Sequence, residues 1–400
     1  TDPTKAEYQS SRGLVVGYVQ SGKTANFTAL AAKAIDAGYR FIIILAGTMN
    51  NLREQTQRRM DKELCGKEAV LDGLDYENLT KEEVKYETYF NEDEEWERDW
   101  NERGGAFLSH GPRYGEPGFP RIRRVTTSRI DYQRKGTNAI DIERPDKSKP
   151  MYDPANLENM KCLVAVVKKN ATVLRHFNSD LRRAAGADPE FKNLPVLVID
   201  DESDQASINT RAQKSRGSKE EVERTAVNEQ ITQILQNCPR AQYVGYTATP
   251  FANVFIDPND PVDLYPRHFV LMLQEPPAYR GARWFHDRAE FADGSEIPTI
   301  KNSQSKAFIR DLIDEDSASD EFYDETRRNE LQTALDMFVL TGALKKYREA
   351  KDPTCSFRHH TMLVHEGVDT AIHQDAAQML RELWRERGYN PVSYTHLTLP

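Results

Sequence analysis

Short apolar runs that alternate with helical segments constrain the fold of this chain more than any other feature of its sequence. Residues 14–16 and 41–45 are runs of aliphatic or aromatic side chains with the length of a buried strand. Residues 25–37 and 50–60, which follow them, have helical composition. Strands buried on both faces read as continuous apolar runs. Strand, helix, strand and helix at this spacing therefore predict a parallel sheet flanked by helices.

The same alternation returns in the middle of the chain. Three further buried strands and two helices are predicted there, at residues 162–167, 196–199 and 243–246 and at residues 172–185 and 222–236. We therefore predict one α/β domain over residues 1–260, with a parallel sheet and helices on its faces.

Other parts of the chain do not follow this rhythm. Residues 61–159 pass from a charged, aromatic segment to a segment rich in Gly and Pro, and we predict an insertion outside the main sheet. Residues 261–327 contain many prolines and are predicted to be an irregular connecting region. Residues 328–391 are predicted to begin a second, truncated domain, with a helix at 328–348, a strand at 361–365 and a helix at 370–387.

The two ends of the sequence differ from those of an ordinary complete chain. It begins without Met, and its first motif starts at Gly17, so we expect an N-terminal part to be missing. Residues 392–400 read VSYTHLTLP, which one reading frame of a common transposon-based sequencing adapter would encode. We interpret these residues as a non-native tail and leave them out of the fold prediction.

Composition limits the class of protein. The chain has 54 Lys and Arg against 63 Asp and Glu residues, a net charge of −9, and basic residues gather at 121–124, 129–135 and 211–219. These clusters are either solvated loops or nucleic-acid contacts, because a binding groove needs only a local positive field. The four cysteines lie far apart without a CxxC pair, which argues against a zinc site and fits a reducing cytoplasm. No apolar run approaches the roughly 18–20 residues of a membrane span, so we expect no membrane association.

The strongest motif is Gly-Tyr-Val-Gln-Ser-Gly-Lys-Thr at residues 17–24, a complete GxxxxGK[ST] loop between a predicted strand and a predicted helix. Glycines let such a loop turn tightly enough to direct its backbone amides at a triphosphate. Lys23 is expected to reach the β and γ phosphates of ATP, and the Thr24 hydroxyl to hold Mg²⁺. The nucleotide-binding residues predicted are Gly17, Gln20, Ser21, Gly22, Lys23 and Thr24.

The second motif follows the apolar run at residues 196–199 and reads Asp-Asp-Glu-Ser-Asp. Acids at the carboxyl end of a parallel strand lie beside the phosphate loop. Alignment on an Asp-Glu-x-Asp pattern favours Asp201 over Asp200 as the metal-binding acid, and Glu202 is expected to polarise the attacking water. Lys23, Asp201 and Glu202 are thus the predicted catalytic residues. The alternative is an ordinary acidic loop after a strand.

The third motif, Gly-Tyr-Thr-Ala-Thr-Pro at residues 245–250, also follows a predicted strand. Small hydroxyl residues in such a loop can hydrogen-bond both the acidic residues and a neighbouring domain. Thr247, Ala248 and Thr249 are therefore predicted to couple hydrolysis to movement.

The end of the second predicted strand supplies candidates for contact with a nucleic-acid backbone. Thr48, Asn51 and Gln55 surround the start of the next helix and could bind phosphate. Helix capping by Thr48 or Asn50 is an equally good interpretation. Lys168 and Lys169 end another strand on the same sheet edge and could also touch phosphate, although a solvated turn is the alternative.

In this order the motifs resemble those of superfamily-two helicases, and more specifically those of the Z-one domain family, bacterial proteins named as endonucleases with a helicase core. The resemblance covers most of residues 13–365 and is weakest over 61–159. It implies two RecA-like domains and ATP-driven action on DNA in restriction or antiphage defence settings. The partners that it implies are nuclease or other defence-system subunits. It also assigns further residues to the extended acidic motif (Asp204, Ser207, Asn209) and to the third motif (Phe251, Asn253, Asp257).

The sequence also departs from the family pattern. Residues 365–369 do not read as expected, and the motifs that carry an arginine finger are expected beyond the end of the chain. We identify no nuclease constellation. The leading hypothesis is Mg²⁺-dependent ATP hydrolysis coupled to movement on duplex DNA. The alternative is a nucleotide-gated clamp that binds DNA or a partner and turns over slowly.

Overall fold

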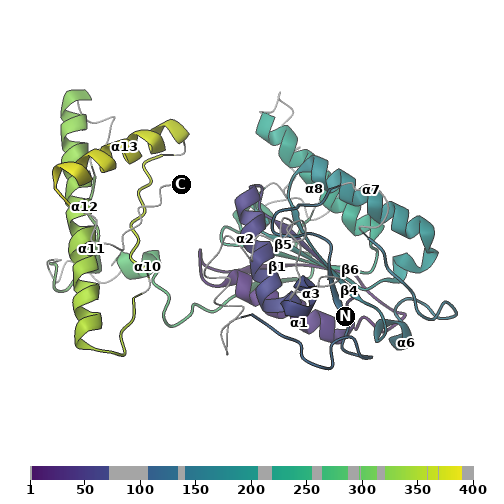
Figure 1. Ribbon diagram of the computed structural model, residues 1–400. Coiled ribbons are helices and arrows are strands. Elements are labelled where there is room, and N and C mark those ends of the chain that lie inside the picture. The colour runs from purple at the N-terminus through teal and green to yellow at the C-terminus, as the bar shows by residue number, and fades with distance from the viewer. Residues whose placement is uncertain are drawn as a thin grey trace, which may run out of the picture. The chain divides into compact units, whose positions relative to one another are not determined.

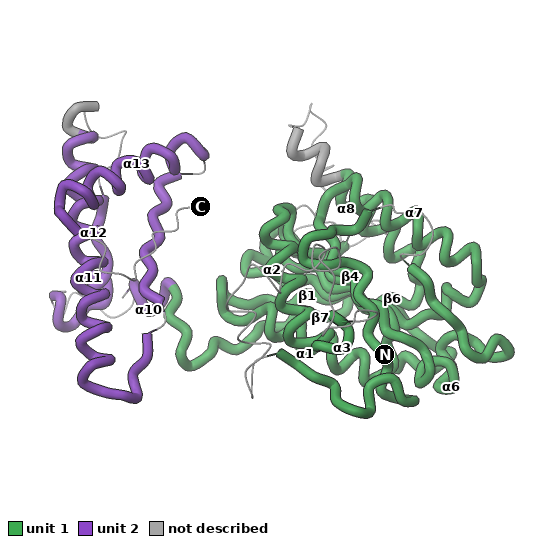
Figure 2. Tube along the Cα trace, viewed as in Figure 1, with its two compact units in different colours: residues 1–281 green, residues 282–400 purple. Residues whose placement is uncertain are grey.

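The computed structural model divides the chain into two compact units, Thr1–Gly281 and Ala282–Pro400 (Figure 2). Each unit is described by itself. The structure describes residues 2–71, 107–133, 140–205, 219–254, 264–286, 297, 299–312, 320–357, 359–367 and 369–389. The boundary between the units falls inside the region predicted to be an irregular connection.

Unit 1 is built on a seven-stranded sheet with the order β3-β4-β2-β5-β6-β1-β7 (Figure 1). Every strand pairing in the sheet is parallel. The strands are β1 (Ser11–Val16), β2 (Phe41–Ala46), β3 (Ile122–Arg124), β4 (Cys162–Lys168), β5 (Val196–Asp201), β6 (Ala241–Thr247) and β7 (Phe269–Met272). The predicted α/β fold with a parallel sheet is confirmed.

Helices cover both faces of this sheet. The helices of unit 1 are α1 (Lys23–Ala37), α2 (Asn50–Met60), η1 (Asp61–Cys65), α3 (Gly66–Val70), α6 (Pro154–Leu157), α7 (Ala171–Ala187), η4 (Pro189–Asn193), α8 (Lys219–Asn237) and α9 (Phe251–Val254). Side chains of α1, α2 and η1 pack on one face, and those of α7 and α8 pack on the other. The two groups of helices lie on opposite sides of the strands in Figure 1.

The central strand β2 shows why both faces need a cover. Its six residues, Phe-Ile-Ile-Ile-Leu-Ala, are all fully buried. Phe41, Ile43 and Leu45 point into the layer under α7 and α8, and Ile42, Ile44 and Ala46 point into the layer under α1 and α2. Alternate side chains of a strand point to opposite faces, so a continuous apolar run specifies a strand with helices on both sides.

Residues at the helix ends match the signals in the sequence. Gly38 ends α1 with φ 109° and donates its backbone N–H to the carbonyls of Ala34 and Ile35. The predicted helix stop at Gly38 is thus confirmed, because glycine adopts this left-handed conformation without a steric cost. Asn170 occupies the N-cap position before α7, where its side chain accepts hydrogen bonds from the N–H groups of Thr172 and Val173.

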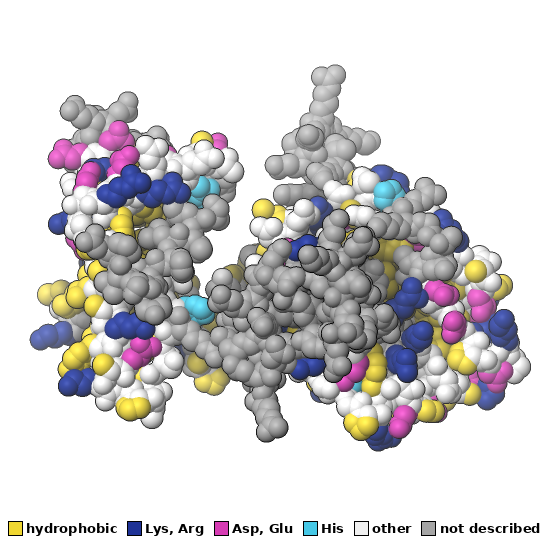
Figure 3. Space-filling model, viewed as in Figure 1, with side chains coloured by type: hydrophobic (Ala, Val, Ile, Leu, Met, Phe, Trp, Pro, Cys, Tyr) yellow, Lys and Arg dark blue, Asp and Glu magenta, His cyan; other side chains and the backbone are white. Residues whose placement is uncertain are grey.

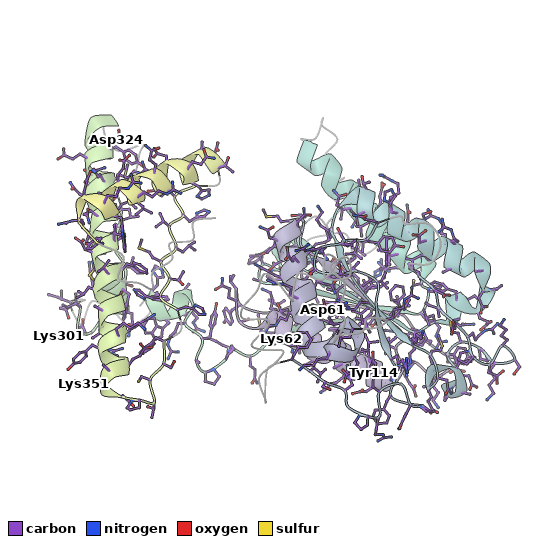
Figure 4. All side chains as sticks on the ribbon, viewed as in Figure 1. Asp61, Lys62, Tyr114, Lys301, Asp324 and Lys351 are labelled. Carbon is purple, nitrogen blue, oxygen red and sulfur yellow. The ribbon has the colours of Figure 1, made fainter. Side chains whose placement is uncertain are left out.

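The predicted insertion at residues 61–159 is partly wrong. η1 and α3 continue directly from α2, and β3 extends the main sheet by pairing with β4. The buried carboxylate of Asp61, at the end of α2 (Figure 4), receives Arg124 from β3 at 3.0 Å. A three-residue strand of Ile-Arg-Arg has no apolar run. This ion pair, the pairing with β4 and the burial of Ile122 in the core hold it in the sheet. Residues 72–106 and 134–139 of the predicted insertion lie outside the described residues.

The irregular region predicted at residues 261–327 is also partly wrong. Phe269–Met272 forms the edge strand β7, which pairs with β1 in register from Gly13 to Val16. Its side chains are exposed, so backbone hydrogen bonds to β1 hold the strand in place and core burial does not. Local composition did not predict it because nearby prolines favour irregular structure.

Unit 2 contains α10 (Ala282–Phe285), α11 (Gln304–Phe308), α12 (Asp320–Lys351) and α13 (Thr370–Glu386). A small core joins Leu331 and Leu335 of α12 to Leu380 and Leu383 of α13. The strand predicted at residues 361–365 is wrong: this segment is extended but unpaired, and Met362 and Val364 pack against the small core. A short strand needs a neighbour to hydrogen-bond, and the described part of unit 2 has no strand.

In the part of the chain that the structure describes, we found no helix that is both long enough and apolar enough to cross a membrane.

The packing of α7 on the sheet can be tested at Phe177. Its ring is fully buried and makes edge contacts with Phe41 and Tyr132, at centroid distances of 6.1 and 4.8 Å. We expect Phe177→Ala to lower the free energy of unfolding by about 3–5 kcal/mol, because it leaves a cavity. Phe119→Ala is the matched control: this ring is 43% exposed, and its loss should cost about 1 kcal/mol or less. Urea denaturation measures both, and equal losses would contradict the assignment of Phe177 to the core.

Candidate functional site

The loops that carry the predicted motifs meet at one edge of the sheet. β1, β6, β5, β2 and β4 are consecutive neighbours and all run in parallel, so their carboxyl ends lie together. Val16 pairs with Thr247, and Tyr246 pairs with Asp201. The loop at residues 17–24 therefore starts two strands away from Asp201, about 10 Å at the spacing of neighbouring strands. Long side chains can bridge such a distance.

The loop at residues 17–24 has the backbone that its glycines predict. Gly22 has φ 94° and directly precedes α1, which begins at Lys23. Gly17 donates its N–H to the carbonyl of Thr247 (3.0 Å). A Cβ at Gly17 would lie 3.1 Å from Lys23 Cγ and 3.2 Å from Ser21 Oγ, so a side chain there would crowd the loop. The loop thus places the amino end of α1 at the sheet edge.

Lys23 and Glu202 come together across the edge. Lys23 Nζ lies 3.9 Å from Glu202 Oε1, with the lysine side chain 8% exposed and the glutamate side chain 34% exposed. These residues are far apart in the sequence. Lys23 follows β1 and Glu202 follows β5, and β6 lies between these two strands. Thr24 is half-buried at the start of α1. The edge therefore combines a nearly buried cation with a more exposed carboxylate.

Unusual backbone conformations occur in both of these loops. In the described part of the chain, the non-glycine residues with positive φ are Gln20 (56°) and Glu202 (51°). A left-handed conformation at such residues costs on the order of 1–3 kcal/mol and persists only when the surroundings hold it. Both residues were assigned to the site from the sequence, and strain of this kind is enriched at functional sites.

The adjacent acids Asp200 and Asp201 have different environments. Asp200 is fully buried and accepts hydrogen bonds from Lys169 Nζ (3.0 Å) and the Tyr243 hydroxyl (2.6 Å). Asp201 is partly exposed and accepts one hydrogen bond from the N–H of Glu202 (3.1 Å). Burial and the neighbouring Glu202 raise the pKa of Asp201 to about 6, against the opposing effect of Lys169 and Lys23. Asp200 is thus occupied by contacts inside the protein, and Asp201 is the partly exposed acid at the carboxyl edge of the sheet.

Lys169 is the clearest correction to the predicted nucleic-acid contacts. Its side chain is fully buried, and its ammonium group binds Asp200 and three backbone carbonyls of the acidic loop. It therefore contacts the protein interior, and the solvated turn that was the alternative is also excluded. The sequence pattern placed Lys169 at the sheet edge correctly, but only the neighbouring strand decided which way its side chain points.

The hydroxyl groups of the third motif bind the acidic loop. Thr247 Oγ1 donates to Asp204 Oδ1 (2.7 Å), and Thr249 Oγ1 donates to Asp204 Oδ2 (2.6 Å). The N–H of Thr249 in turn donates to Thr247 Oγ1 (2.9 Å). Ala248 lies between them and is half-buried. The loops after β5 and β6 are thus joined through one carboxylate, while the role of these residues in coupling stays a prediction.

Further contacts fix the same two loops. A Cβ at Gly245 would lie 2.8 Å from Ser203 Oγ, so glycine is needed there to let the acidic loop approach β6. Asn253, from α9, donates to the carbonyl of Ser203 (3.2 Å). Tyr246 donates its hydroxyl to Asn26 on α1 (2.8 Å), and so links β6 to the helix after the loop at residues 17–24. The roles of Tyr243 and Tyr246 were missed because a tyrosine inside an apolar strand reads as core.

The other nucleic-acid candidates lie where the prediction placed them. Thr48, Asn51 and Gln55 are exposed at the start of α2. Met49 occupies the N-cap position before α2, and no side chain caps this helix end, so capping by Thr48 or Asn50 is not observed. Lys168 is half-buried and donates to Asn50 Oδ1 (2.7 Å). Their contact with nucleic acid stays a prediction.

Several residues singled out from the sequence lie outside the described residues. These are Ser207, Asn209, Asp257 and most of the basic cluster at 211–219. On the face shown in Figure 3, the Lys and Arg side chains of unit 1 lie among Asp and Glu side chains and form no single basic patch.

Within the described ranges, no group of three or more His, Cys, Asp or Glu side chains is arranged to hold a metal ion. Mg²⁺ differs from metals that need such a cage, because it is commonly held by one or two carboxylates, substrate phosphates and water. The hard oxygen donors at this edge, Asp201 and Thr24, fit that mode.

Comparison with known proteins bears on unit 2. Residues 330–393 match the family model described as Z1 domain. The match supports the resemblance to the Z-one domain family and includes residues 365–369, which the sequence pattern alone had not assigned to it. The loops of the candidate site lie outside the matched segment. No curated protein and no solved structure matches the chain.

The raised pKa of Asp201 makes a prediction about stability. The folded protein holds the Asp201 proton up to about pH 6, whereas the carboxyl of an unfolded chain titrates near 3.8. Ionisation of Asp201 therefore destabilises the fold increasingly as pH rises from about 4 to 6, and constantly above that. We expect Asp201→Asn to raise the free energy of unfolding at pH 7.5 by up to about 3 kcal/mol, and by much less at pH 4.

Urea denaturation of the variant and the parent protein at both pH values measures this difference. Asp36→Asn, at an exposed position on α1, is the control and should change stability little at either pH. A stabilisation by Asp201→Asn that is the same at pH 4 and pH 7.5 would show that ionisation of this carboxyl is not its cause.

Proposed function

We propose that this chain is the ATP-hydrolysing part of a DNA helicase or translocase, with a RecA-like P-loop domain in unit 1. The observation that carries the proposal is the approach of Lys23 Nζ to Glu202 Oε1 at 3.9 Å. A phosphate-binding lysine and a water-activating acid must lie within one phosphate group of each other. Here two motifs distant in sequence meet in that way at the carboxyl edge of a parallel sheet, where ligands of such folds bind.

The loop at residues 17–24 would bind the triphosphate. Gly17, Gln20, Ser21 and Gly22 supply backbone N–H groups around the start of α1, whose dipole favours an anion. The Lys23 side chain is nearly buried, so its ammonium group would stay close to the β and γ phosphates. Binding of the triphosphate would draw Lys23 away from Glu202 and leave that carboxylate free to accept a proton.

Glu202 is the residue that would orient the attacking water. It is more exposed than Lys23, and its left-handed backbone directs the side chain towards the loop after β1. Asp201 and Thr24 would hold Mg²⁺, which when bound offsets charge on the phosphate oxygens. Asp201 must lose its proton to bind a cation, and its pKa is raised to about 6. Metal binding would therefore weaken as pH falls below about 6.

Thr247 and Thr249 would connect hydrolysis to movement. Both bind Asp204, two residues after Glu202, so a shift of the acidic loop is transmitted directly to the loop after β6. The proposed substrate of the movement is duplex DNA, contacted through the exposed side chains Thr48, Asn51 and Gln55 and by Lys168. The Z-one resemblance suggests a setting in restriction or antiphage defence, with nuclease or other defence subunits as partners. The separated cysteines fit a cytoplasmic location.

ATP hydrolysis can be tested with two substitutions in the complete gene product. Lys23→Ala should weaken ATP binding and reduce turnover by about 100-fold or more, because a central phosphate contact is lost. Glu202→Gln should keep ATP binding within about threefold and reduce turnover by a similar factor, because only the orientation of water is lost. Lys33→Ala, at an exposed position on α1, is the matched control and should behave as the parent protein.

Steady-state phosphate release and equilibrium ATP binding measure these effects. Unchanged turnover in Lys23→Ala would remove the phosphate-loop assignment. Equal losses of binding and turnover in Glu202→Gln would place the catalytic base elsewhere.

Contact with DNA makes a separate prediction. Affinity for a short duplex should fall steeply with salt concentration if phosphate contacts dominate. Gln55→Glu should weaken binding several-fold by placing a negative charge near a phosphate, whereas Gln236→Glu, at an exposed position on α8, should not. Fluorescence anisotropy over a range of salt measures both.

A flat salt response would remove phosphate-dominated DNA binding and favour a protein partner. Tight binding of DNA that needs ATP but proceeds with slow, DNA-independent turnover would favour the nucleotide-gated clamp over a motor.

A further inference from the structure

Lys169 is a buried cation that the proposed chemistry does not use. It directly follows Lys168, the last residue of β4, and its side chain is fully shielded from solvent. Lysine is rarely buried in this way, because removing an ammonium group from water costs free energy unless every proton has a partner. The contacts that Lys169 makes should therefore indicate its role.

The ammonium group of Lys169 binds the backbone of the acidic loop. Nζ lies 2.7 Å from the carbonyl oxygen of Asp201, 2.6 Å from that of Glu202 and 3.0 Å from that of Gln205. These carbonyls point to one side of the turn that follows β5. A hydroxyl or amide side chain offers fewer protons than an ammonium group and could not satisfy the same set.

The charge of Lys169 is balanced beneath the loop. Asp200 Oδ1 accepts from Lys169 Nζ at 3.0 Å, and Asp200 Oδ2 accepts from the Tyr243 hydroxyl at 2.6 Å. Burial and the charge of Asp200 raise the pKa of Tyr243, so this phenol keeps its proton and remains a donor. Lys169 thus lies between an acid of the strand and the carbonyls of the loop that the strand carries.

The backbone of Lys169 is itself held by a neighbouring strand. Its N–H lies 3.2 Å from the carbonyl oxygen of Ala46 and 3.4 Å from that of Gly47, at the end of β2. The ammonium group therefore works from an anchored position. One of the carbonyls that it binds belongs to Glu202, the residue with the left-handed backbone conformation (φ 51°).

We propose that Lys169 is a positioning residue that holds the acidic loop in the left-handed turn from which Glu202 faces Lys23. This inference rests on the proposed ATPase function, because it concerns the orientation of the proposed water-activating acid. Lys169 does not touch the substrate. It acts through three backbone carbonyls, and Asp200 allows its charge to stay inside the protein.

The test uses the complete chain with the double substitution Lys169→Met/Asp200→Asn, which removes both members of the buried pair and leaves no unpaired charge. Lys161→Met, at the exposed start of the same strand region, is the matched control. We expect the double variant to bind ATP within about threefold of the parent protein and to lose about 10- to 100-fold in turnover, because Glu202 is misplaced. Thermal unfolding verifies that each variant is folded.

A second measurement separates positioning from a general structural effect. If Lys169 acts through Glu202, the same double substitution made in a Glu202→Gln background should change the remaining turnover by less than about threefold. A further loss of 10-fold or more in that background would overturn the proposal, as would undiminished turnover in the double variant itself.

A third measurement does not depend on ATPase activity. The amides of Ser203 and Gln205 are hydrogen-bonded within this region, to the carbonyls of Tyr246 and Glu202. Hydrogen exchange over residues 201–205 should become faster in the double variant and stay unchanged in Lys161→Met. Unchanged exchange would overturn the role of Lys169. Faster exchange in a protein whose parent neither binds nor hydrolyses ATP would support the hold on the loop while removing the proposed function.

Discussion

The parallel pairing of β1, β6 and β5 is the constraint on which the candidate site depends. Parallel strands bring their carboxyl ends to one edge, and the register places Val16 beside Thr247 and Tyr246 beside Asp201. The loop at residues 17–24 and the acidic loop after β5 are therefore separated by a single strand. The long side chains of Lys23 and Glu202 meet across it, and the shorter Thr247, at the end of β6, binds Asp204 of the acidic loop.

Charge burial divides the residues of this edge into two sets. Lys169 and Asp200 are fully buried and form an ion pair with each other, so neither side chain is available to bind a ligand. Asp201 and Glu202 remain closer to solvent, and partial burial of Asp201 together with repulsion from Glu202 raises the pKa of Asp201 to about 6. The protein thus forgoes stability that it would gain by losing one of these acids, and perturbed acids of this kind are common at functional sites.

The strong apolar runs predicted the central strands well. The predicted strand at residues 41–45 became β2 with one added residue, because a run buried on both faces has few alternative structures. Elements at the edges were not predicted. β3 has two arginines and depends on Asp61, β7 has exposed side chains and depends on β1, and the segment at 361–365 found no strand to pair with.

The sequence by itself determined which residues could take part in the site, because GxxxxGKT and Asp-Asp-Glu-Ser-Asp specify a tight glycine turn and acids after a strand. Tertiary structure decided the role of each neighbour. Asp200 and Asp201 are adjacent, as are Lys168 and Lys169, yet one of each pair points inward. Successive side chains of a strand face opposite ways, and which way is buried depends on the strands and helices packed beside it.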